Sequence, residues 1–300
     1  VVLERQFKFK HTNEIWTGVP IFSANMDTTG TFETAITLQK HKMLTAIHKF
    51  YSIKDWEKNV EKLDPNFISV TVGQSKEDLQ LGQKIFSLNS DIKYLCIDVA
   101  NGYREDFINS VKNYRETFPD KIIIAGNVAT REMTEALILA GADIVKIGIG
   151  PGSVCTTRSV AGVGYPQLSS ISECSDAAHG LGGHVMADGG CKYPGDVSKA
   201  FGAGADYVML GGMFAGHKES GGELVTDEEG VQYKDFYGMS STKAQQTYYG
   251  DLAEHRAPEG KKVRLRYKGE LDKTVQSILG GMRSACSYVG AKKLKDLPKS

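Results

Sequence analysis

The sequence lacks a long uninterrupted apolar run, and it lacks an excess of charge of either sign. No apolar stretch approaches the ~18 residues that suggest a membrane span, so we expect none. The start of the chain shows no charged-then-apolar leader. Lys plus Arg and Asp plus Glu both number 36, which gives a formal net charge of zero. A general nucleic-acid-binding protein needs a basic surface to displace phosphate counterions, and this balance argues against that class.

Cysteine is sparse, and its spacing argues against two common uses. No two cysteines form a C-x-x-C pair, and their number is odd: Cys96, Cys155, Cys174, Cys191 and Cys286. Neither a zinc knuckle nor a disulfide framework is expected from this pattern. It is typical of a reduced chain, and we expect a cytoplasmic location.

Short apolar runs rich in β-branched residues recur along the chain. We predict eight strands, at about Pro20–Ala24, Leu44–His48, Phe67–Val72, Tyr94–Val99, Ile122–Gly126, Ile144–Gly148, His184–Ala187 and Tyr207–Leu210. Runs that are apolar at nearly every position are typical of parallel strands buried on both faces. Amphipathic segments lie between them and predict helices at Trp56–Leu63, Glu105–Phe118, Glu132–Ala140, Pro194–Phe201 and Asp272–Arg283.

Strands that alternate with helices in this way predict a (β/α)₈ TIM barrel, which we expect to form one domain over residues 1–300. The alternative is an open doubly wound sheet, but its Gly-rich turn follows the first strand, whereas the Gly-rich turns here come late. Two connections are long, roughly Pro151–Ser170 and Met213–Gly269. Such loops are usually functional, and we expect residues 213–269 to form a flap. Within it, Lys262–Tyr267 alternates well enough to form a strand.

Glycine pairs follow the seventh and eighth predicted strands, where barrels of this kind often bind phosphate. The sequence there reads Asp188-Gly189-Gly190 and Gly211-Gly212. Backbone N–H groups of glycine can approach an anion without obstruction, although glycine pairs also serve tight turns. Because Asp188 would repel a phosphate, we expect it to bind hydroxyls such as a ribose diol.

The loop after the sixth predicted strand carries the strongest chemical signal. Glycine and proline over Gly148–Gly152 impose an unusual backbone path, and Cys155 follows directly. A cysteine is usually an inert buried residue. On a loop at a catalytic barrel face it can instead be exposed, with its thiolate stabilised by N–H groups and by Arg158. A dinucleotide-binding fingerprint is rejected because no helix follows at once and no acidic residue stands ~20 positions on. We therefore predict that Cys155 is a nucleophile.

Polar residues at the other predicted strand ends would ring the barrel mouth. They are Asn25, Asp27, His48, Lys49, Asp98, Asn101 and Asn127. Many could simply bond to one another or cap helices, and Lys49 and Asp98 are the better candidates for ligand contact. In the long final connection, Glu259 could be a proton donor or relay, or only a solvated charge.

Together these motifs resemble the family that contains IMP dehydrogenase and GMP reductase, and the likeness runs across nearly the whole chain. Gly148–Arg158 resembles the family's cysteine loop. IMP dehydrogenases usually carry a paired regulatory module after the second strand, but here Ile47–Lys49 runs straight on to the third. Four segments, Asn25–Thr28, His48–Lys49, Asp98–Tyr103 and Ala215–Glu223, resemble the GMP reductase branch.

The resemblance implies that GMP and NADPH yield IMP, ammonia and NADP⁺. Cys155 would attack C2 of guanine and form a thioimidate when ammonia leaves, and Thr157 and Glu259 match the family's proton relay. The substrate-binding positions implied are Ser153, Asp188, Gly189, Gly190, Gly211, Gly212, Gly238, Met239, Ser240, Arg256, Ala257, Pro258, Glu259 and Gly260.

The same resemblance implies a cofactor site shared between subunits, and hence a homotetramer. The positions facing NADPH would be Lys49, Asp98, Val99, Ala100, Ile149, Gly150, Met239, His255, Arg256, Ser284, Ala285, Cys286 and Ser287. His255, Arg256 and the last four would come from a neighbouring subunit. The carbonyls of Gly150, Gly152, Cys155 and Arg158 resemble a monovalent-cation site for K⁺. Two alternatives stay open: an IMP dehydrogenase without its regulatory module, and a non-catalytic nucleotide-binding barrel.

Overall fold

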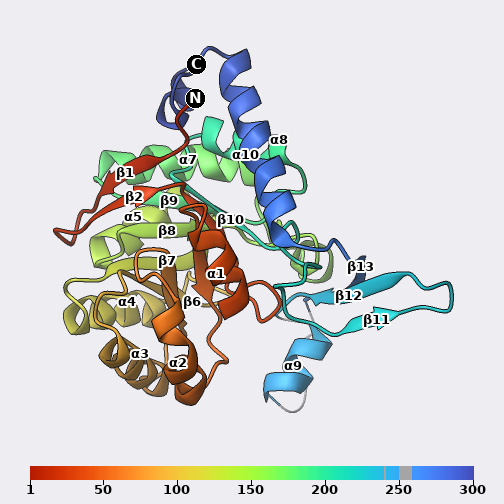
Figure 1. Cartoon of the computed structure of the whole chain (residues 1–300). Helices are drawn as coiled ribbons and strands as arrows, with labels where there is room; N and C mark the ends of the chain where they lie inside the picture. Colours follow the sequence, from red (N-terminus) through yellow and green to blue (C-terminus); the bar gives the residue numbers. More distant parts are fainter. Residues whose placement is uncertain (240, 250–258) are drawn as a thin grey trace.

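The computed structural model describes residues 1–239, 241–249 and 259–300, and these contain a closed barrel of parallel strands (Figure 1). The strands are β3 (Ile21–Ser23), β4 (Leu44–Ile47), β5 (Ile68–Val72), β6 (Tyr94–Asp98), β7 (Ile122–Val128), β8 (Ile144–Ile147), β9 (His184–Asp188) and β10 (Tyr207–Leu210). They follow one another around the barrel in chain order, and β10 closes it by pairing with β3. The predicted (β/α)₈ barrel is confirmed.

Helices form the outer layer of the barrel (Figure 1). They are α1 (Phe32–Gln39), α2 (Ile53–Asn59), α3 (Lys76–Leu88), α4 (Glu105–Thr117), α5 (Arg131–Ala140), α7 (Gln167–Gly180), α8 (Pro194–Gly202) and α10 (Leu271–Tyr288). The helix predicted at Trp56–Leu63 begins earlier, because Ser52 and Asp55 form a reciprocal capping box, and it ends in the 3₁₀ turn η1 (Val60–Lys62). A second 3₁₀ turn, η2 (Leu294–Lys299), ends the chain.

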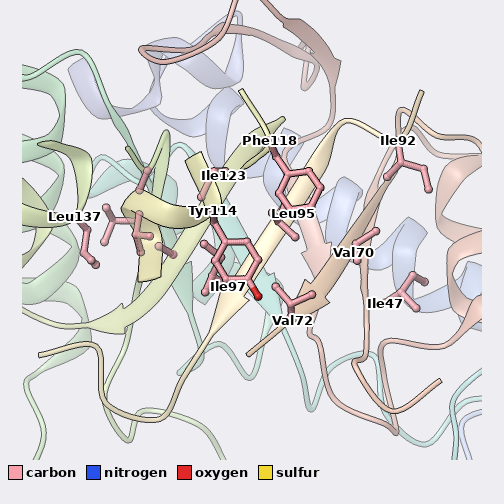
Figure 2. Packing of buried hydrophobic residues seen from close by; sticks show 14 of the residues in the cluster. Ile47, Val70, Val72, Ile92, Leu95, Ile97, Tyr114, Phe118, Ile123 and Leu137 are labelled. Carbon is pink, nitrogen blue, oxygen red and sulfur yellow. The ribbon is translucent and has the colours of Figure 1, made fainter. Parts of the chain in front are cut away.

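The barrel strands alternate between an inner and an outer core. On β6, Tyr94 and Cys96 pack inside the barrel, whereas Leu95 and Ile97 pack outward against the helices (Figure 2). This period of two places apolar residues on both faces of each strand, which is why the strands read as continuous apolar runs.

A hairpin that the sequence analysis did not anticipate covers the N-terminal end of the barrel. Strands β1 (Arg5–Lys8) and β2 (Ile15–Gly18) pair antiparallel before the first barrel strand. The ring of Phe7 lies 4.8 Å from that of Tyr207, and the ring of Trp16 lies 5.7 Å from it. Since this end is closed by aromatic packing, ligands can approach the barrel core only from the C-terminal ends of the strands.

The long connection after β10 contains regular structure of its own. Strands β11 (Leu224–Thr226), β12 (Gln232–Tyr237) and β13 (Lys262–Arg266) form an antiparallel sheet, and helix α9 (Thr242–Tyr249) lies beside it (Figure 1). The strand predicted at Lys262–Tyr267 is confirmed as β13. Among the residues that the structure describes, none of the helices combines the length and apolar character that crossing a membrane requires.

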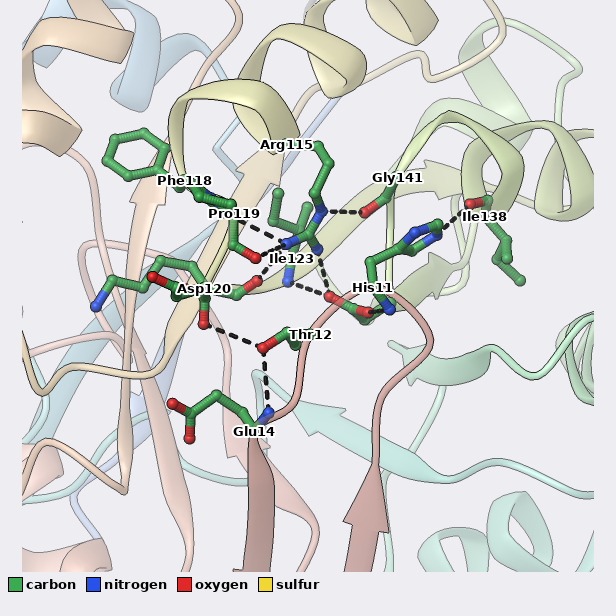
Figure 3. A network of polar contacts seen from close by, with 12 residues as sticks. His11, Thr12, Glu14, Arg115, Phe118, Pro119, Asp120, Ile123, Ile138 and Gly141 are labelled. Carbon is green, nitrogen blue, oxygen red and sulfur yellow. Dashed lines mark hydrogen bonds and ion pairs between the residues drawn. The ribbon is translucent and has the colours of Figure 1, made fainter.

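One buried carboxylate joins the hairpin to the barrel (Figure 3). Asp143, at the start of β8, is fully buried and accepts hydrogen bonds from the backbone N–H of His11 at 2.9 Å and of Ile123 at 3.0 Å. It also binds the guanidinium of Arg115, which donates further to carbonyls at Gly141 and Lys121. Burial lowers the pKa of Arg115, and the charge of Asp143 works against that effect.

We expect Asp143→Ala to lower the free energy of unfolding by about 3 kcal/mol, because it leaves buried N–H groups without acceptors and a half-buried guanidinium without its counterion. Urea unfolding would measure the loss. Asp106→Ala is the matched control, since Asp106 pairs with Arg104 in an exposed position and should cost less than ~1 kcal/mol. Equal losses in both variants would contradict this role of Asp143.

Candidate active site

Three loops meet at the C-terminal end of the barrel, after β8, β9 and β10. A Cβ added to Gly189 would lie 3.0 Å from Pro151 Cγ, and one added to Gly212 would lie 3.0 Å from Ser153 Oγ. Gly189 and Gly190 have φ values of +87° and +89°, which side-chain-bearing residues rarely adopt. The glycine pairs therefore allow close approach of the loops, and backbone N–H groups at this place can meet an anion.

Cys155 is held by a segment more than a hundred residues away. The Thr156 N–H donates to the Glu259 carbonyl at 3.0 Å, and the Lys261 N–H donates to the Val154 carbonyl at 2.8 Å. These bonds make an antiparallel bridge in which Cys155 faces Gly260. A Cβ on Gly260 would lie 2.9 Å from the Ser241 nitrogen, so glycine is required for this packing. The long connection thus forms one wall of the cysteine site.

A short hydrogen-bonded chain runs from the sulfur of Cys155 to a carboxylate. Cys155 Sγ lies 3.1 Å from Thr157 Oγ1, and that hydroxyl donates to Glu259 Oε2 at 2.7 Å. Because the one hydroxyl hydrogen of Thr157 points at Glu259, the bond to the sulfur is one in which the thiol donates. A proton can therefore pass from the Cys155 thiol through the Thr157 hydroxyl to the Glu259 carboxylate.

Arg158 does not contact the sulfur, contrary to the sequence-based expectation that it stabilises the thiolate. Its guanidinium donates to the carbonyls of Ile149 at 3.3 Å and Tyr165 at 2.6 Å. The side chain therefore braces the loop. The physical reason is local: the loop folds back so that Gly150 lies against Arg158, and a Cβ at Gly150 would lie 2.9 Å from Arg158 Cγ.

A buried lysine that sequence analysis missed lies beneath these loops. The ammonium of Lys146, on β8, is 2.8 Å from Asp98 Oδ1 and 2.7 Å from Asp188 Oδ2. Burial opposes its charge, but the two carboxylates outweigh burial and hold the pKa of Lys146 above its ordinary value. Burial alone would raise the pKa of Asp98, but Lys146 outweighs that effect and holds it below its ordinary value. The one sequence feature that could have revealed Lys146 is a single lysine inside the apolar run Ile144–Ile147.

The predicted mouth residues are partly engaged with one another. Asn127 donates to Asp188 Oδ2 at 3.0 Å and to the Gly148 carbonyl at 2.8 Å, and Asn25 bonds Asp98. Asn101 accepts from the Tyr103 N–H at 3.0 Å and shapes a turn. Asp188, the predicted hydroxyl acceptor, therefore has one oxygen committed to Lys146 and Asn127.

The loop after β4 is fixed by His48 and by the long connection. Burial lowers the pKa of His48 to about 4, so its ring is neutral at pH 7 and its Nδ1 accepts the Phe50 N–H at 3.2 Å. The ring of Phe50 stacks on Tyr248 of α9 with centroids 3.7 Å apart. Asp27 accepts hydrogen bonds from the phenols of Tyr237 and Tyr248. The charge of Lys49 acts on Asp98, so these two candidates lie near each other.

Some predicted positions lie elsewhere or cannot be placed. Ser284–Ser287 form the last turns of α10, outside the group of loops around Cys155, and the side chain of Cys286 is buried in the core. Met239 lies directly after Gly238, which packs against the Val154 carbonyl. The predicted positions outside the described residues are Ser240, His255, Arg256, Ala257 and Pro258.

Comparisons with known proteins give matches over nearly the whole chain. Residues 2–300 match a family model described as the IMP dehydrogenase / GMP reductase domain. Proteins named GMP reductase are similar over the whole chain. One from Buchnera aphidicola subsp. Acyrthosiphon pisum is 56% identical, and the match covers 86% of its length. One from Aeromonas hydrophila is 55% identical with 87% of its length covered, and one from Caenorhabditis elegans is 54% identical with 84% covered.

We expect Lys146→Met to lower the free energy of unfolding by about 3 kcal/mol at pH 7, because it leaves two carboxylates without their buried counterion. In the native chain the lowered pKa of Asp98 adds stability above its unfolded pKa of about 3.9, and this contribution fades as the pH falls. The difference between variant and native protein should therefore shrink toward pH 3.

Urea unfolding across that pH range is the measurement. Lys93→Met is the matched control, since Lys93 pairs with Glu14 at a half-exposed position and should contribute less than ~1 kcal/mol. A loss in Lys146→Met that is the same at pH 7 and pH 3 would contradict the electrostatic explanation.

Proposed function

The chain belongs to the IMP dehydrogenase and GMP reductase family, and we propose that it catalyses the NADPH-dependent reductive deamination of GMP to IMP. The observation that carries this proposal is the chain of hydrogen bonds from Cys155 through Thr157 to Glu259, set beside a glycine-lined cradle. With one proton taken up, GMP and NADPH would give IMP, ammonia and NADP⁺.

The substrate would bind with its phosphate at the glycine pairs. Gly189, Gly190 and Gly212 lie against the loop that carries Ser153, and Gly211 directly precedes Gly212. Backbone N–H groups with a serine hydroxyl are suitable phosphate donors. The ribose would lie toward Asp188. This orientation leaves the guanine base over Cys155, walled by Gly238, Met239 and Gly260.

Cys155 would then attack C2 of the guanine ring. Loss of its proton through Thr157 to Glu259 produces the thiolate, and the S–C2 bond forms at an amidine-like, electrophilic carbon. Glu259 would return the same proton through Thr157 to the 2-amino group, so the C2–N bond breaks with ammonia rather than an amide anion as leaving group. A thioimidate on Cys155 remains. The sulfur later departs as thiolate when C2 has gained hydrogen.

NADPH, when bound, supplies the hydride that C2 requires. The residues suited to hold it are Lys49, Asp98–Ala100 and Ile149–Gly150, at the mouth beside Cys155. Asp98 keeps part of its carboxylate accessible while Lys146 fixes its position, which suits a carboxamide donor. Their task is to orient the cofactor and exclude water. The family resemblance is what supports NADPH rather than NADH as the cofactor of this chain.

We further propose, from the family resemblance, that a monovalent cation, K⁺, binds in the loop that follows β8. The carbonyls of Gly150, Gly152, Cys155 and Arg158 belong to one folded-back segment, in which a Cβ on Gly150 would lie 3.4 Å from Thr157 Cβ. Carbonyl oxygens are suitable ligands for such an ion. It would hold the loop in the conformation that presents Cys155.

We also propose a cytoplasmic homotetramer in which each barrel is one catalytic domain and residues 213–269 act as a flap. His255, Arg256 and Ser284–Ser287 would complete a neighbouring subunit's cofactor site. The alternative within the family is oxidation of IMP at the same cysteine. Assays in both directions separate the two: NADPH consumption with GMP supports the proposal, whereas NADH formation from IMP without any reaction of GMP contradicts it.

We expect Cys155→Ser to abolish turnover while GMP still binds, because the thiolate is required for the S–C2 bond and not for holding the phosphate. Calorimetry with GMP would measure binding. Mass spectrometry of the native enzyme quenched during turnover should find a purine adduct on the peptide containing Cys155. Full activity in the variant would overturn the role of Cys155 and favour a non-covalent mechanism.

We expect Glu259→Gln and Thr157→Val each to lower kcat by about 10²–10⁴-fold, since each interrupts the proton path to the leaving amine. KM for GMP should change much less. Glu229→Gln is the control, because Glu229 lies exposed in the turn between β11 and β12. A variant that raises KM but leaves kcat unchanged would show that the residue only binds the substrate.

A further inference from the structure

A second cluster of polar side chains lies at the opposite end of the barrel from Cys155. It consists of His179 in the last turn of α7, His184 at the start of β9 and Asp206 just before β10. Asp188, which ends β9 at the active site, is about 13 Å away along that strand. The proposed reaction uses none of the three residues.

The three side chains present convergent ligand atoms. His179 Nε2 lies 2.7 Å from Asp206 Oδ2, and His184 Nδ1 lies 3.5 Å from the same oxygen. One ligand atom from each residue can be chosen so that all lie within 4.8 Å of one another. Within the part of the chain that the structure describes, this is the group of His, Cys, Asp and Glu side chains that could hold a metal ion.

His184 supplies an independent sign that the cluster is arranged for a ligand. Its Nε2 lies 2.8 Å from the carbonyl of Lys8, which can only accept, so Nε2 carries the hydrogen. In the neutral ring Nδ1 then carries a lone pair. That atom is buried and has no hydrogen-bond partner among the described residues, although it faces Asp206. A ring nitrogen aimed at the site, with the other nitrogen bonded to a backbone carbonyl, is the arrangement that orients histidine as a metal ligand.

The charges and the accessibility also suit a cation. Asp206 is buried, and its Oδ2 accepts a hydrogen bond from the Val185 N–H at 3.0 Å while lying 2.7 Å from His179 Nε2. The carboxylate is thus held in place with its second oxygen, Oδ1, outside these two contacts. Arg5 is the nearby positive charge, 3.8 Å from the other oxygen, Oδ1, and its guanidinium lies over the ring of Phe7. The His179 side chain is 45% exposed, which gives an ion an entry path.

We propose that His179, His184 and Asp206 form a binding site for a divalent transition-metal ion of the Zn²⁺, Ni²⁺ or Co²⁺ class. Two imidazoles and one carboxylate are borderline ligands that such ions prefer over Mg²⁺ or Ca²⁺, and water would complete the coordination. The ion would join α7, β9 and β10, and through the Lys8 carbonyl it would fix the hairpin that closes this end of the barrel. Its effect is on stability and not on the reaction at Cys155.

The test is calorimetric titration of the full-length chain with Ni²⁺ alone, after treatment with a chelator. The native protein should bind one ion, and His179→Ala should weaken that binding by about tenfold or more. His179→Gln is a second variant that can keep a hydrogen bond to Asp206 and so preserve the fold, while its amide is a poor ligand for this class of ion. Ni²⁺ should raise the Tm of the native protein and not of either variant.

Two controls separate this site from other sources of Ni²⁺ binding. His41→Ala removes an imidazole that pairs with Asp272 alone, and Cys155→Ser removes the reactive thiol. Both should bind the ion as the native protein does. Binding that survives in His179→Ala and His179→Gln, binding that disappears in Cys155→Ser, or no binding in the native protein would overturn the proposal. The three residues would then be an ion-pair network only.

Discussion

The C-terminal end of the barrel depends on the ion pairs that the Lys146 ammonium makes with two carboxylates. This ammonium is almost fully buried, and it binds carboxylates that end two other strands, Asp98 on β6 and Asp188 on β9. Asn127 of β7 bonds the same oxygen of Asp188. The ammonium thus joins β6, β8 and β9, and the hydrogen bond from Asn127 to Asp188 adds β7 to the same polar network.

The loops of the candidate active site begin directly above that charge. Because carboxylates without Lys146 would repel each other and take up protons, the barrel mouth could not stay both polar and ordered. The arrangement leaves part of Asp98 and Asp188 available to ligands while their positions are fixed. The buried Lys146 therefore fixes polar side chains at the point where the strands end. The cost of removing its charge from water is offset by the two carboxylates that it binds.

The position of Cys155 depends on a different constraint, the pairing of residues 154–156 with residues 259–261. This pairing brings Glu259 to Thr157 and closes the path from the thiol to the carboxylate. The hydrogen-bonded path exists only while the two segments are paired, so the proton transfer proposed for Cys155 depends on that pairing.

The sequence predicted those parts of the molecule whose cause is local. Buried parallel strands are apolar on both faces, so β4 to β10 could be recognised from composition, and the glycine pairs marked the loops after β9 and β10. The hairpin β1–β2 was missed because each strand is short and exposed at alternate positions. Lys146 was missed because one lysine in an apolar run carries no sign of its partners. The bridge between Cys155 and Gly260 joins positions 105 apart in sequence, and no local pattern contains it. The residues alone left Glu259 open between a proton relay and a solvated charge, and resemblance to a family favoured the relay.

The two ends of β9 show how such a barrel divides its tasks. Asp188 at one end serves the active site, and His184 at the other lies among residues that fix α7, β10 and the hairpin. The strand between them is buried and apolar, and it keeps the polar groups of the two ends about 13 Å apart. A cation held by His179, His184 and Asp206 would therefore strengthen the closed end without contacting the groups at the barrel mouth. A substitution at the closed end could then change stability while the contacts around Cys155 stay the same.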